Sequence, residues 1–151
     1  MSEIETYRID KTEDVKIGTA ALWDATNKLA TTMPAGPTNT QIAGFVGVFN
    51  QNRVKLSDNF DGTHSYSDQL GLVVAGETYL EVDGAVDIGD LLMFSASAAG
   101  KFTKRTFANL ADVFDDAESE VEILKQTQLP RIKAMEKSTT ARRIKARIGS
   151  L

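Results

Sequence analysis

The stretch VKIGTAALWDATNKLATT, residues 15–32, decides how the chain folds. Val15 and Ile17 alternate with polar residues, which is the pattern of a half-buried strand, and Gly18 follows them. An apolar run ending in Trp23, the turn-forming Asp-Ala-Thr-Asn and a returning Lys-Leu-Ala-Thr come next. This order predicts a β-hairpin that begins at a sharp backbone reversal, because glycine adopts conformations closed to other residues.

A second stretch, VDIGDLLMFSASAAGKFTK at residues 86–104, repeats this order, and Val86 lies 71 positions after Val15. Phe94 stands in the place of Trp23, and a returning Lys-Phe matches the earlier Lys-Leu after a two-residue difference in the loop. We expect both aromatics, and the Val-x-Ile before each glycine, to be buried. Two copies are too few for a solenoid, which needs about three, so the sequence predicts a small β-barrel or sandwich with two similar hairpins.

Further elements are predicted from apolar runs that are bounded by turn residues. Asp83-Gly84 is one such turn. Stretches rich in Pro, Gly, Ser, Thr and Asp are predicted as loops. The predicted strands are 42–49, 69–74 and 77–82, and the predicted loops are 33–41 and 57–68.

The C-terminal part of the chain departs from this pattern. Apolar residues recur at helical spacing over residues 109–126 and acidic residues occupy the opposite face, which predicts an amphipathic α-helix. Three apolar residues then alternate with Arg143, Lys145 and Arg147. This alternation predicts a terminal strand, about residues 141–149, with one apolar and one basic face.

The length of 151 residues predicts a single domain. Residues 1–14 show neither a strand nor a helix period, so we predict an N-terminal arm in front of one β-rich domain at 15–151. The N-terminus lacks the apolar segment of a secretory signal. The longest apolar runs, about seven residues, fall short of the roughly 20 that a membrane-spanning helix needs. We therefore expect synthesis in a cytoplasm and no membrane partner.

Charge is distributed unevenly along the chain, whose net charge is −4. Residues 1–125 carry 10 basic and 20 acidic side chains, whereas residues 126–151 carry 7 basic and 1 acidic. Such asymmetry predicts that the basic end meets an acidic surface, either on the chain's own body or on a partner. Nucleic acid is not expected as that partner, because the acidic remainder would repel phosphates and no aromatic residues interleave the basic ones.

No motif predicts catalysis, a metal site or a cofactor. The single histidine, His64, lies among serines and an aspartate in a polar stretch, but closeness in sequence does not make a catalytic triad. The chain contains no cysteine. A group of carboxylates alternates along strands and turns, as on a solvated face. These carboxylates are Glu77, Glu81, Asp83, Asp87 and Asp90.

Four segments of short predicted strands and turns stand out together: 17–29, 42–48, 86–102 and 132–148. They contain an Ile-Gly-Asp-Leu turn, a returning Gly-Lys-Phe and a terminal Ile-Lys-Ala-Arg-Ile strand. In these segments, about two thirds of the chain, the sequence resembles the capsid decoration, or cement, proteins of tailed bacteriophages.

The resemblance implies a non-enzymatic virion structural protein without a cofactor. Such a protein would bind the outside of the mature head and stabilise the lattice of the major capsid protein. It would sit on the outer surface of the capsid as a homo-oligomer, with a trimer favoured. The resemblance also implies that residues 1–14 contact the capsid.

Six residues are therefore candidates for partner binding: Ile4, Tyr7, Ile9, Arg143, Lys145 and Arg147. The three cations would face either the acidic helix or the shell.

Two other classes of function stay open. One is another virion part, such as a tail or head-fibre adaptor. The other is a carbohydrate-binding β module that stacks sugar on aromatic side chains, for which the candidates are Trp23, Phe94, Tyr66 and Tyr79.

Overall fold

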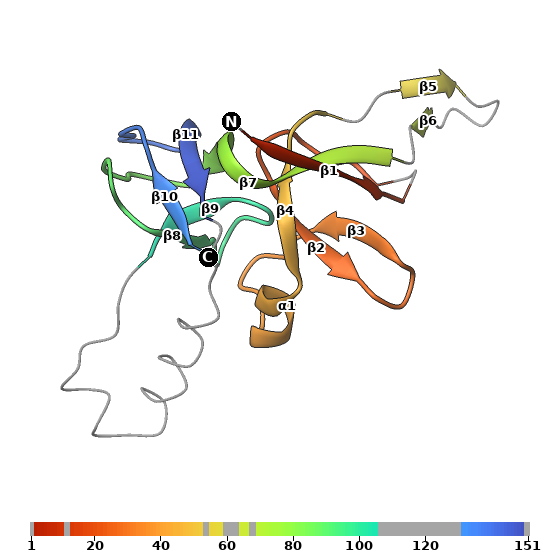
Figure 1. Ribbon diagram of the computed structural model, residues 1–151, viewed down its shortest axis with the longest axis horizontal. Helices are drawn as coiled ribbons and strands as arrows, with labels where there is room; N and C mark the ends of the chain where they lie inside the picture. Colours follow the sequence, from red (N-terminus) through yellow and green to blue (C-terminus); the bar gives the residue numbers. More distant parts are fainter. Residues whose placement is uncertain are drawn as a thin grey trace.

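The computed structural model describes residues 2–10, 13–52, 55–58, 64–66, 69–105 and 131–149. Within these ranges the chain is mainly β, which confirms the predicted class, and the elements are arranged as in Figure 1. They are β1 (Glu3–Arg8), β2 (Ala20–Asp24), β3 (Leu29–Thr32), α1 (Asn39–Ala43), β4 (Phe45–Phe49), β5 (Lys55–Asp58), β6 (His64–Tyr66), β7 (Gln69–Val82), β8 (Leu92–Phe94), β9 (Phe102–Lys104), β10 (Ile132–Ala134) and β11 (Arg142–Ile148).

The long strand β7 organises a nine-stranded sheet. Its first half pairs antiparallel with β1 and β4, and its second half pairs antiparallel with β11. A single parallel pair, Val82 with Phe102, joins β7 to β9. The strand therefore runs through both halves of the molecule, as Figure 1 shows.

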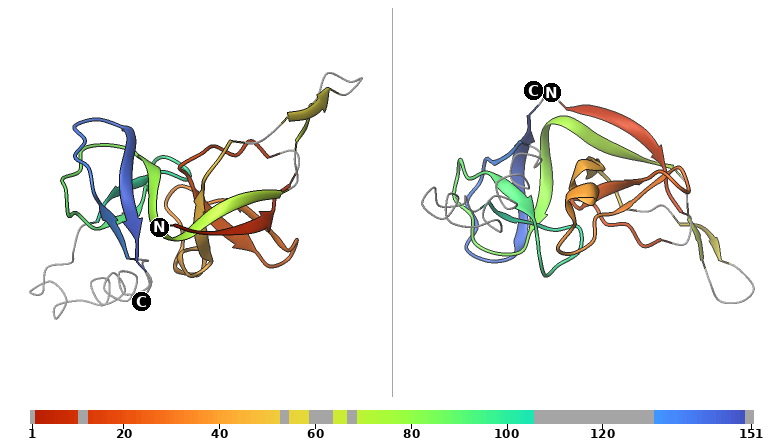
Figure 2. Two further views of the ribbon diagram at one scale, coloured as in Figure 1. Left: turned by 45° about the horizontal axis from the view of Figure 1, so that its top comes forward. Right: turned by 90° about the horizontal axis from the view of Figure 1, so that it is seen from below.

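The ladders do not close this sheet into a barrel. Two isolated bridges connect strands that lie at its edges: Ile9 with Ala30, and Leu91 with Lys133. The strands β5 and β6 form a separate two-stranded sheet. Figure 2 shows that this small hairpin projects from the rest of the molecule. Two segments that the sequence predicts as loops thus contain regular structure, because β5 and β6 lie within or beside 57–68 and α1 begins inside 33–41.

Two hydrophobic clusters lie against this sheet. The larger includes Leu80, Phe94 and Phe102 from the C-terminal half, together with Val73. The smaller includes Leu72. Because side chains alternate across a strand, the neighbours Leu72 and Val73 point to opposite faces of β7 and enter different clusters.

The two repeated stretches form equivalent hairpins, as predicted. Gly18 and Gly89 both have positive φ, at 84° and 91°. In the first hairpin, Asp24 Oδ1 accepts hydrogen bonds from the backbone N–H groups two and three residues later, at 3.0 and 3.2 Å. In the second, Ser95 Oγ accepts the same two bonds at 3.2 and 3.0 Å. Different residue types therefore fix the same turn.

The structure corrects the alignment at the ends of these turns. Lys28 has a φ of 55° and Gly100 a φ of 74°, so these two residues occupy the same left-handed position. Lys28 thus corresponds to Gly100, whereas the sequence comparison matches it to the following lysine. The loops differ by one residue rather than two.

Two expected core residues are exposed. Ile88 is 71% exposed, because it lies in the turn 87–90 and not on a strand. Trp23 is 38% exposed on β2, whereas its counterpart Phe94 is 3% exposed within the larger cluster. The repeat therefore preserves backbone conformation while the burial of matched side chains differs.

The extents of two predicted strand regions also differ. The segments 69–74 and 77–82 form one continuous strand, β7, and Gly76 lies inside it with a φ of 93°. The predicted strand 42–49 shortens to 45–49, because Thr38 begins α1 with a capping box that uses Gln41. The terminal strand is confirmed as β11. The predicted helix 109–126 lies outside the described residues.

The N-terminal segment has a place in the chain's own sheet, which differs from the predicted arm. Residues 3–8 pair with β7 from Glu3 opposite Ala75 to Arg8 opposite Gln69. Ile9 then enters the smaller cluster. A strand with no clear hydrophobic period forms here because its backbone pairs with β7, while most of its side chains stay exposed.

Candidate interaction surface

The outer face of the β7–β11 ladder carries a row of paired charges. The register places Arg143 opposite Glu81 and Arg147 opposite Glu77. Arg143 Nε lies 3.2 Å from Glu81 Oε1, and Arg147 Nη2 lies 2.9 Å from Glu77 Oε1. Lys145 Nζ binds the other oxygen of Glu77 at 3.2 Å. Three cations of β11 therefore share two carboxylates of β7.

The basic end of the chain meets acidic residues of the chain's own body, which is one of the two possibilities that the charge asymmetry leaves open. The three basic side chains of β11 meet carboxylates of the chain's own strand β7. Hydrogen bonds from Arg147 and Lys145, and their positive charge, lower the pKa of the Glu77 carboxyl below its ordinary value. The cations remain partly exposed, and one positive charge stays uncompensated within this row.

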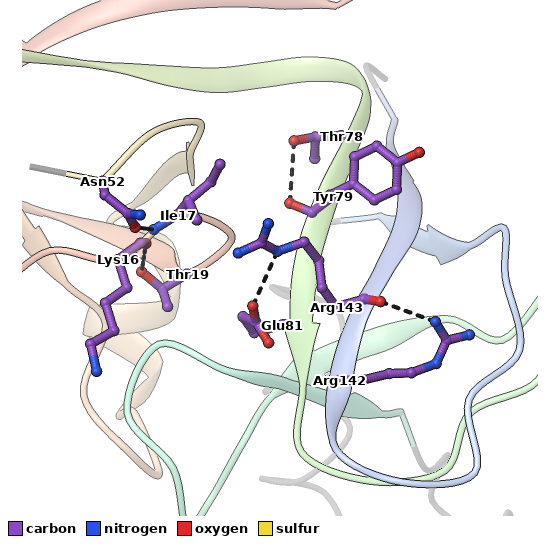
Figure 3. Close-up of polar contacts among 9 residues, drawn as sticks. All are labelled: Lys16, Ile17, Thr19, Asn52, Thr78, Tyr79, Glu81, Arg142 and Arg143. Carbon is purple, nitrogen blue, oxygen red and sulfur yellow. Dashed lines mark hydrogen bonds and ion pairs between the residues drawn. The ribbon is translucent and has the colours of Figure 1, made fainter.

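A pocket of about 490 Å³ adjoins one end of the row. Figure 3 shows Arg143 and Glu81 across from the turn that carries Lys16, Ile17 and Thr19. Thr19 Oγ1 donates to the carbonyl of Lys16 at 2.7 Å, and the Ile17 N–H donates to the side-chain oxygen of Asn52 at 2.8 Å. The charged row and the first glycine turn therefore form one continuous surface.

Apolar side chains are exposed on the same half of the molecule. Tyr79 projects from β7 two residues before Glu81 (Figure 3), and it is 53% exposed. Ile88 borders a hollow of about 250 Å³ with Ala134 and Met135. Lys133 and Arg147 complete the lining of this hollow, so Arg147 belongs to both the charged row and the hollow.

The three predicted N-terminal candidates lie along β1 and its end, beside the first half of β7. Ile4 is 53% exposed, whereas Ile9 is 1% exposed. Tyr7 is half-buried and packs edge-on against Trp23, with ring centroids 6.0 Å apart. Of these residues, Ile4 and Tyr7 can reach a partner directly, while Ile9 stabilises the strand from inside the cluster.

The Tyr7 hydroxyl donates to Glu5 Oε2 at 3.1 Å. Burial of the phenol raises the pKa of Tyr7 above its ordinary value, and the hydrogen bond to Glu5 and the charge of that carboxylate raise it further. Tyr7 and Trp23 therefore form an ordered, partly exposed aromatic pair on the N-terminal half.

The clustered carboxylates do not converge on one point. Asp83 accepts a 2.5 Å hydrogen bond from Ser95 Oγ. Asp87 faces Lys137 at 3.9 Å, and Asp90 faces Lys104 at 3.8 Å. Among the residues that the structure describes, no group of three or more histidine, cysteine, aspartate or glutamate side chains could hold a metal ion. His64 begins β6, and its backbone alone is described.

No family model matches the sequence, and no curated protein matches it. In the part of the chain that the structure describes, no helix has the length and apolar character needed to cross a membrane.

Sequence reasoning identified the cations of β11 but missed the groups around them. The sequence predicts a solvated face for the glutamates of β7 and burial for Ile88, whereas the glutamates pair with the cations and Ile88 is exposed. The sequence does contain a signal for the glutamates, because Glu77, Tyr79 and Glu81 alternate at strand spacing, as the cations of β11 do. The register that joins the two rows is a property of the fold alone.

Proposed function

We propose that this chain is a decoration protein of a tailed bacteriophage, which binds the outside of the mature head and stabilises the lattice of the major capsid protein. The curled sheet serves as a barrel-like or sandwich-like body, and its exposed faces bind the shell. The function requires neither catalysis nor a cofactor, and the proposed assembly is a homotrimer on the outer capsid surface.

The observation that carries the proposal is the outer face of β7 and β11. A surface supported by a sheet, with an exposed tyrosine among arginines, suits a broad contact with another protein, because Tyr and Arg are enriched at protein interfaces. The strand pairing holds these side chains in fixed places, so little conformational freedom is lost on binding. The resemblance of the segments 17–29, 42–48, 86–102 and 132–148 to decoration proteins supplies the identity of the partner.

Stabilisation of a shell would follow from preferential binding. A protein that binds the expanded shell and not its precursor stabilises the expanded form by mass action. Several linked copies on a lattice raise the effective affinity even when each contact is weak. A trimer with three copies of the β7–β11 face has this advantage.

Co-sedimentation with purified heads tests the proposal. The chain is mixed with expanded, undecorated heads, and unexpanded proheads serve as the control. We expect saturable binding to expanded heads alone, with a stoichiometry that reports whether trimers occupy the sites. Absence of binding to both forms would overturn the proposal, and localisation in the tail or a head fibre would instead assign another virion part.

A triple charge reversal at Arg143, Lys145 and Arg147 extends this test. If the cations contact the shell, binding falls while most of the thermal stability is kept. If their only role is the pairing with Glu77 and Glu81, thermal stability falls and binding is unchanged.

A second candidate, a carbohydrate-binding β module, is favoured by one observation. The exposed Trp23 packs edge-on against Tyr7 and offers an ordered aromatic surface for a sugar ring. Tyr79 is exposed as well, but Phe94 is buried and is therefore withdrawn as a stacking residue. Because the chain has a single tryptophan, quenching of its fluorescence by a panel of glycans tests this candidate directly.

A further inference from the structure

The two glycine turns provide an internal comparison within one chain. Ile17 precedes Gly18 in the first turn and Ile88 precedes Gly89 in the second, and the two glycines share the same backbone conformation. Ile17 is half-buried in the pocket that Asn52 and Arg143 also line. Ile88 is 71% exposed. The chain covers the first isoleucine in part, whereas the second is mostly exposed.

The backbone holds the turn of Ile88 firmly in place. The Gly89 N–H donates to the carbonyl of Ala134 at 2.8 Å, and the Ala134 N–H donates to the carbonyl of Asp90 at 2.8 Å. The adjacent bridge joins Leu91 to Lys133. Exposure of Ile88 is thus built into an ordered turn fixed to β10. A single exposed apolar side chain is common on protein surfaces, so the case for an interaction site rests on the hollow and the charged residues beside Ile88.

The hollow beside Ile88 combines an apolar floor with a basic rim. Ala134 and Met135 line the apolar part, and its volume of about 250 Å³ is enough for one apolar side chain. Lys133 and Arg147 stand at the rim. Within the described ranges Lys133 makes no ion pair, and Arg147 shares its carboxylate with Lys145. Among the residues that the structure describes, the rim therefore has more positive charge than its carboxylate partners neutralise.

From these features we infer that the Ile88 hollow is a docking site for an acidic segment of a partner protein. One apolar side chain of the segment fills the hollow against Ile88 and Met135, and flanking carboxylates pair with Lys133 and Arg147. Charge complementarity selects the acidic partner and speeds its encounter, while burial of the apolar side chain holds it. The identity of the partner rests on the proposed function, under which the major capsid protein supplies the acidic segment.

The test uses the full chain and a synthetic peptide, Glu-Glu-Leu-Glu-Glu, as the probe, followed by nuclear magnetic resonance of the backbone amides. We expect saturable shifts at residues 87–90, 133–135 and 147, which weaken as salt is added. The matched peptide with glutamine at every glutamate position should bind at least about tenfold more weakly. Shifts that lie elsewhere, equal binding of both peptides, or no shifts at millimolar peptide would each overturn the inference.

Variants then separate the two parts of the site. Ile88→Ser should weaken binding of the acidic peptide about tenfold, whereas Ile88→Leu should keep it. Lys133→Glu should abolish the preference for the acidic peptide, and Lys28→Glu, on the exposed tip of the first hairpin, is the control for a change of charge. Retained binding in Ile88→Ser would overturn the role of the hollow.

The same variants in head co-sedimentation distinguish this inference from the proposed function. If the unaltered chain binds expanded heads and Ile88→Ser binds equally well, the docking site is wrong and the function stands. If the unaltered chain binds no heads but the acidic peptide titrates at the hollow, the function is wrong and the docking site stands.

Discussion

Gly100 is the residue at which the second hairpin contacts the base of the first. Its N–H donates to the carbonyl of Met33 at 2.7 Å, and its carbonyl accepts from the Ala20 N–H at 2.8 Å. Its φ of 74° is strained for any residue with a side chain. A Cβ atom built there would lie 2.8 Å from Thr32 Cγ2 and 2.9 Å from Thr19 Cβ. The positive φ and the lack of room for a Cβ atom therefore both favour glycine at this position.

We expect Gly100→Ala to lower the free energy of unfolding by about 2 kcal/mol or more, because backbone strain and overpacking add. Gly84→Ala is the matched control, since nothing lies within 4 Å of the Cβ it would add. Its effect should stay within about 0.5 kcal/mol. Urea denaturation of both variants checks the difference, and equal midpoints for the two would contradict the contact.

At the scale of elements, the pairing of β7 with β11 combines an apolar and a charged face. Ile144 is fully buried opposite Leu80 in the register, while Glu77 on the outer face is held by Arg147 and Lys145. Exposed ion pairs of this kind contribute modestly to stability and are screened by salt. The apolar face thus holds the two strands together, and the charged face adds a pH-dependent contribution.

Glu77→Gln should make that contribution measurable. The paired carboxyl has a folded-state pKa below its ordinary 4.5, so it stabilises the protein above that pH and the stabilisation is lost as pH falls through the folded pKa. We expect the variant to be less stable than the unaltered protein at neutral pH, and the difference in urea midpoint to shrink below pH 4.5. A difference that grows on acidification would contradict the pairing.

High salt provides the control for this prediction. About 1 M sodium chloride at neutral pH should also reduce the difference between Glu77→Gln and the unaltered protein, because the Debye length falls to about 3 Å. A difference that salt leaves unchanged would point to packing rather than charge.

At the scale of the whole molecule, one strand joins two hydrophobic clusters. β7 contributes Leu72 to the smaller cluster and Val73 and Leu80 to the larger one. The N-terminal half, with β1–β4, and the C-terminal half, with β8–β11, lie on either side of its bend in Figure 1. Neither half can lose its core without releasing part of the same strand, so we expect the two halves to unfold together.

The position of the single tryptophan makes this expectation testable. Trp23 reports on the N-terminal half, whereas Leu80 is buried in the cluster dominated by the C-terminal half. We expect Leu80→Ala, which costs about 2–5 kcal/mol at a buried site, to shift the fluorescence transition and the circular dichroism transition equally. Fluorescence that keeps its original midpoint would show that the halves unfold separately.

The local features of the fold follow from the amino-acid sequence alone. Short-range chemistry specified the two hairpins, their glycine turns at Gly18 and Gly89, and the terminal strand with its basic face. These features follow from side-chain alternation and from the backbone freedom of single residues. Both properties depend only on residues that are neighbours in the sequence.

Which of these local features face solvent, and which contact each other, depends on how the whole chain packs. Periodicity cannot distinguish the buried Phe94 from the exposed Trp23, because burial depends on the strands that cover each position. The pairing of Arg147 with Glu77, and of β1 with β7, joins residues about 70 positions apart through a register that no local pattern encodes. The exposure of Ile88 has the same cause, since the placement of the rest of the chain covers Ile17 in part and leaves its counterpart exposed.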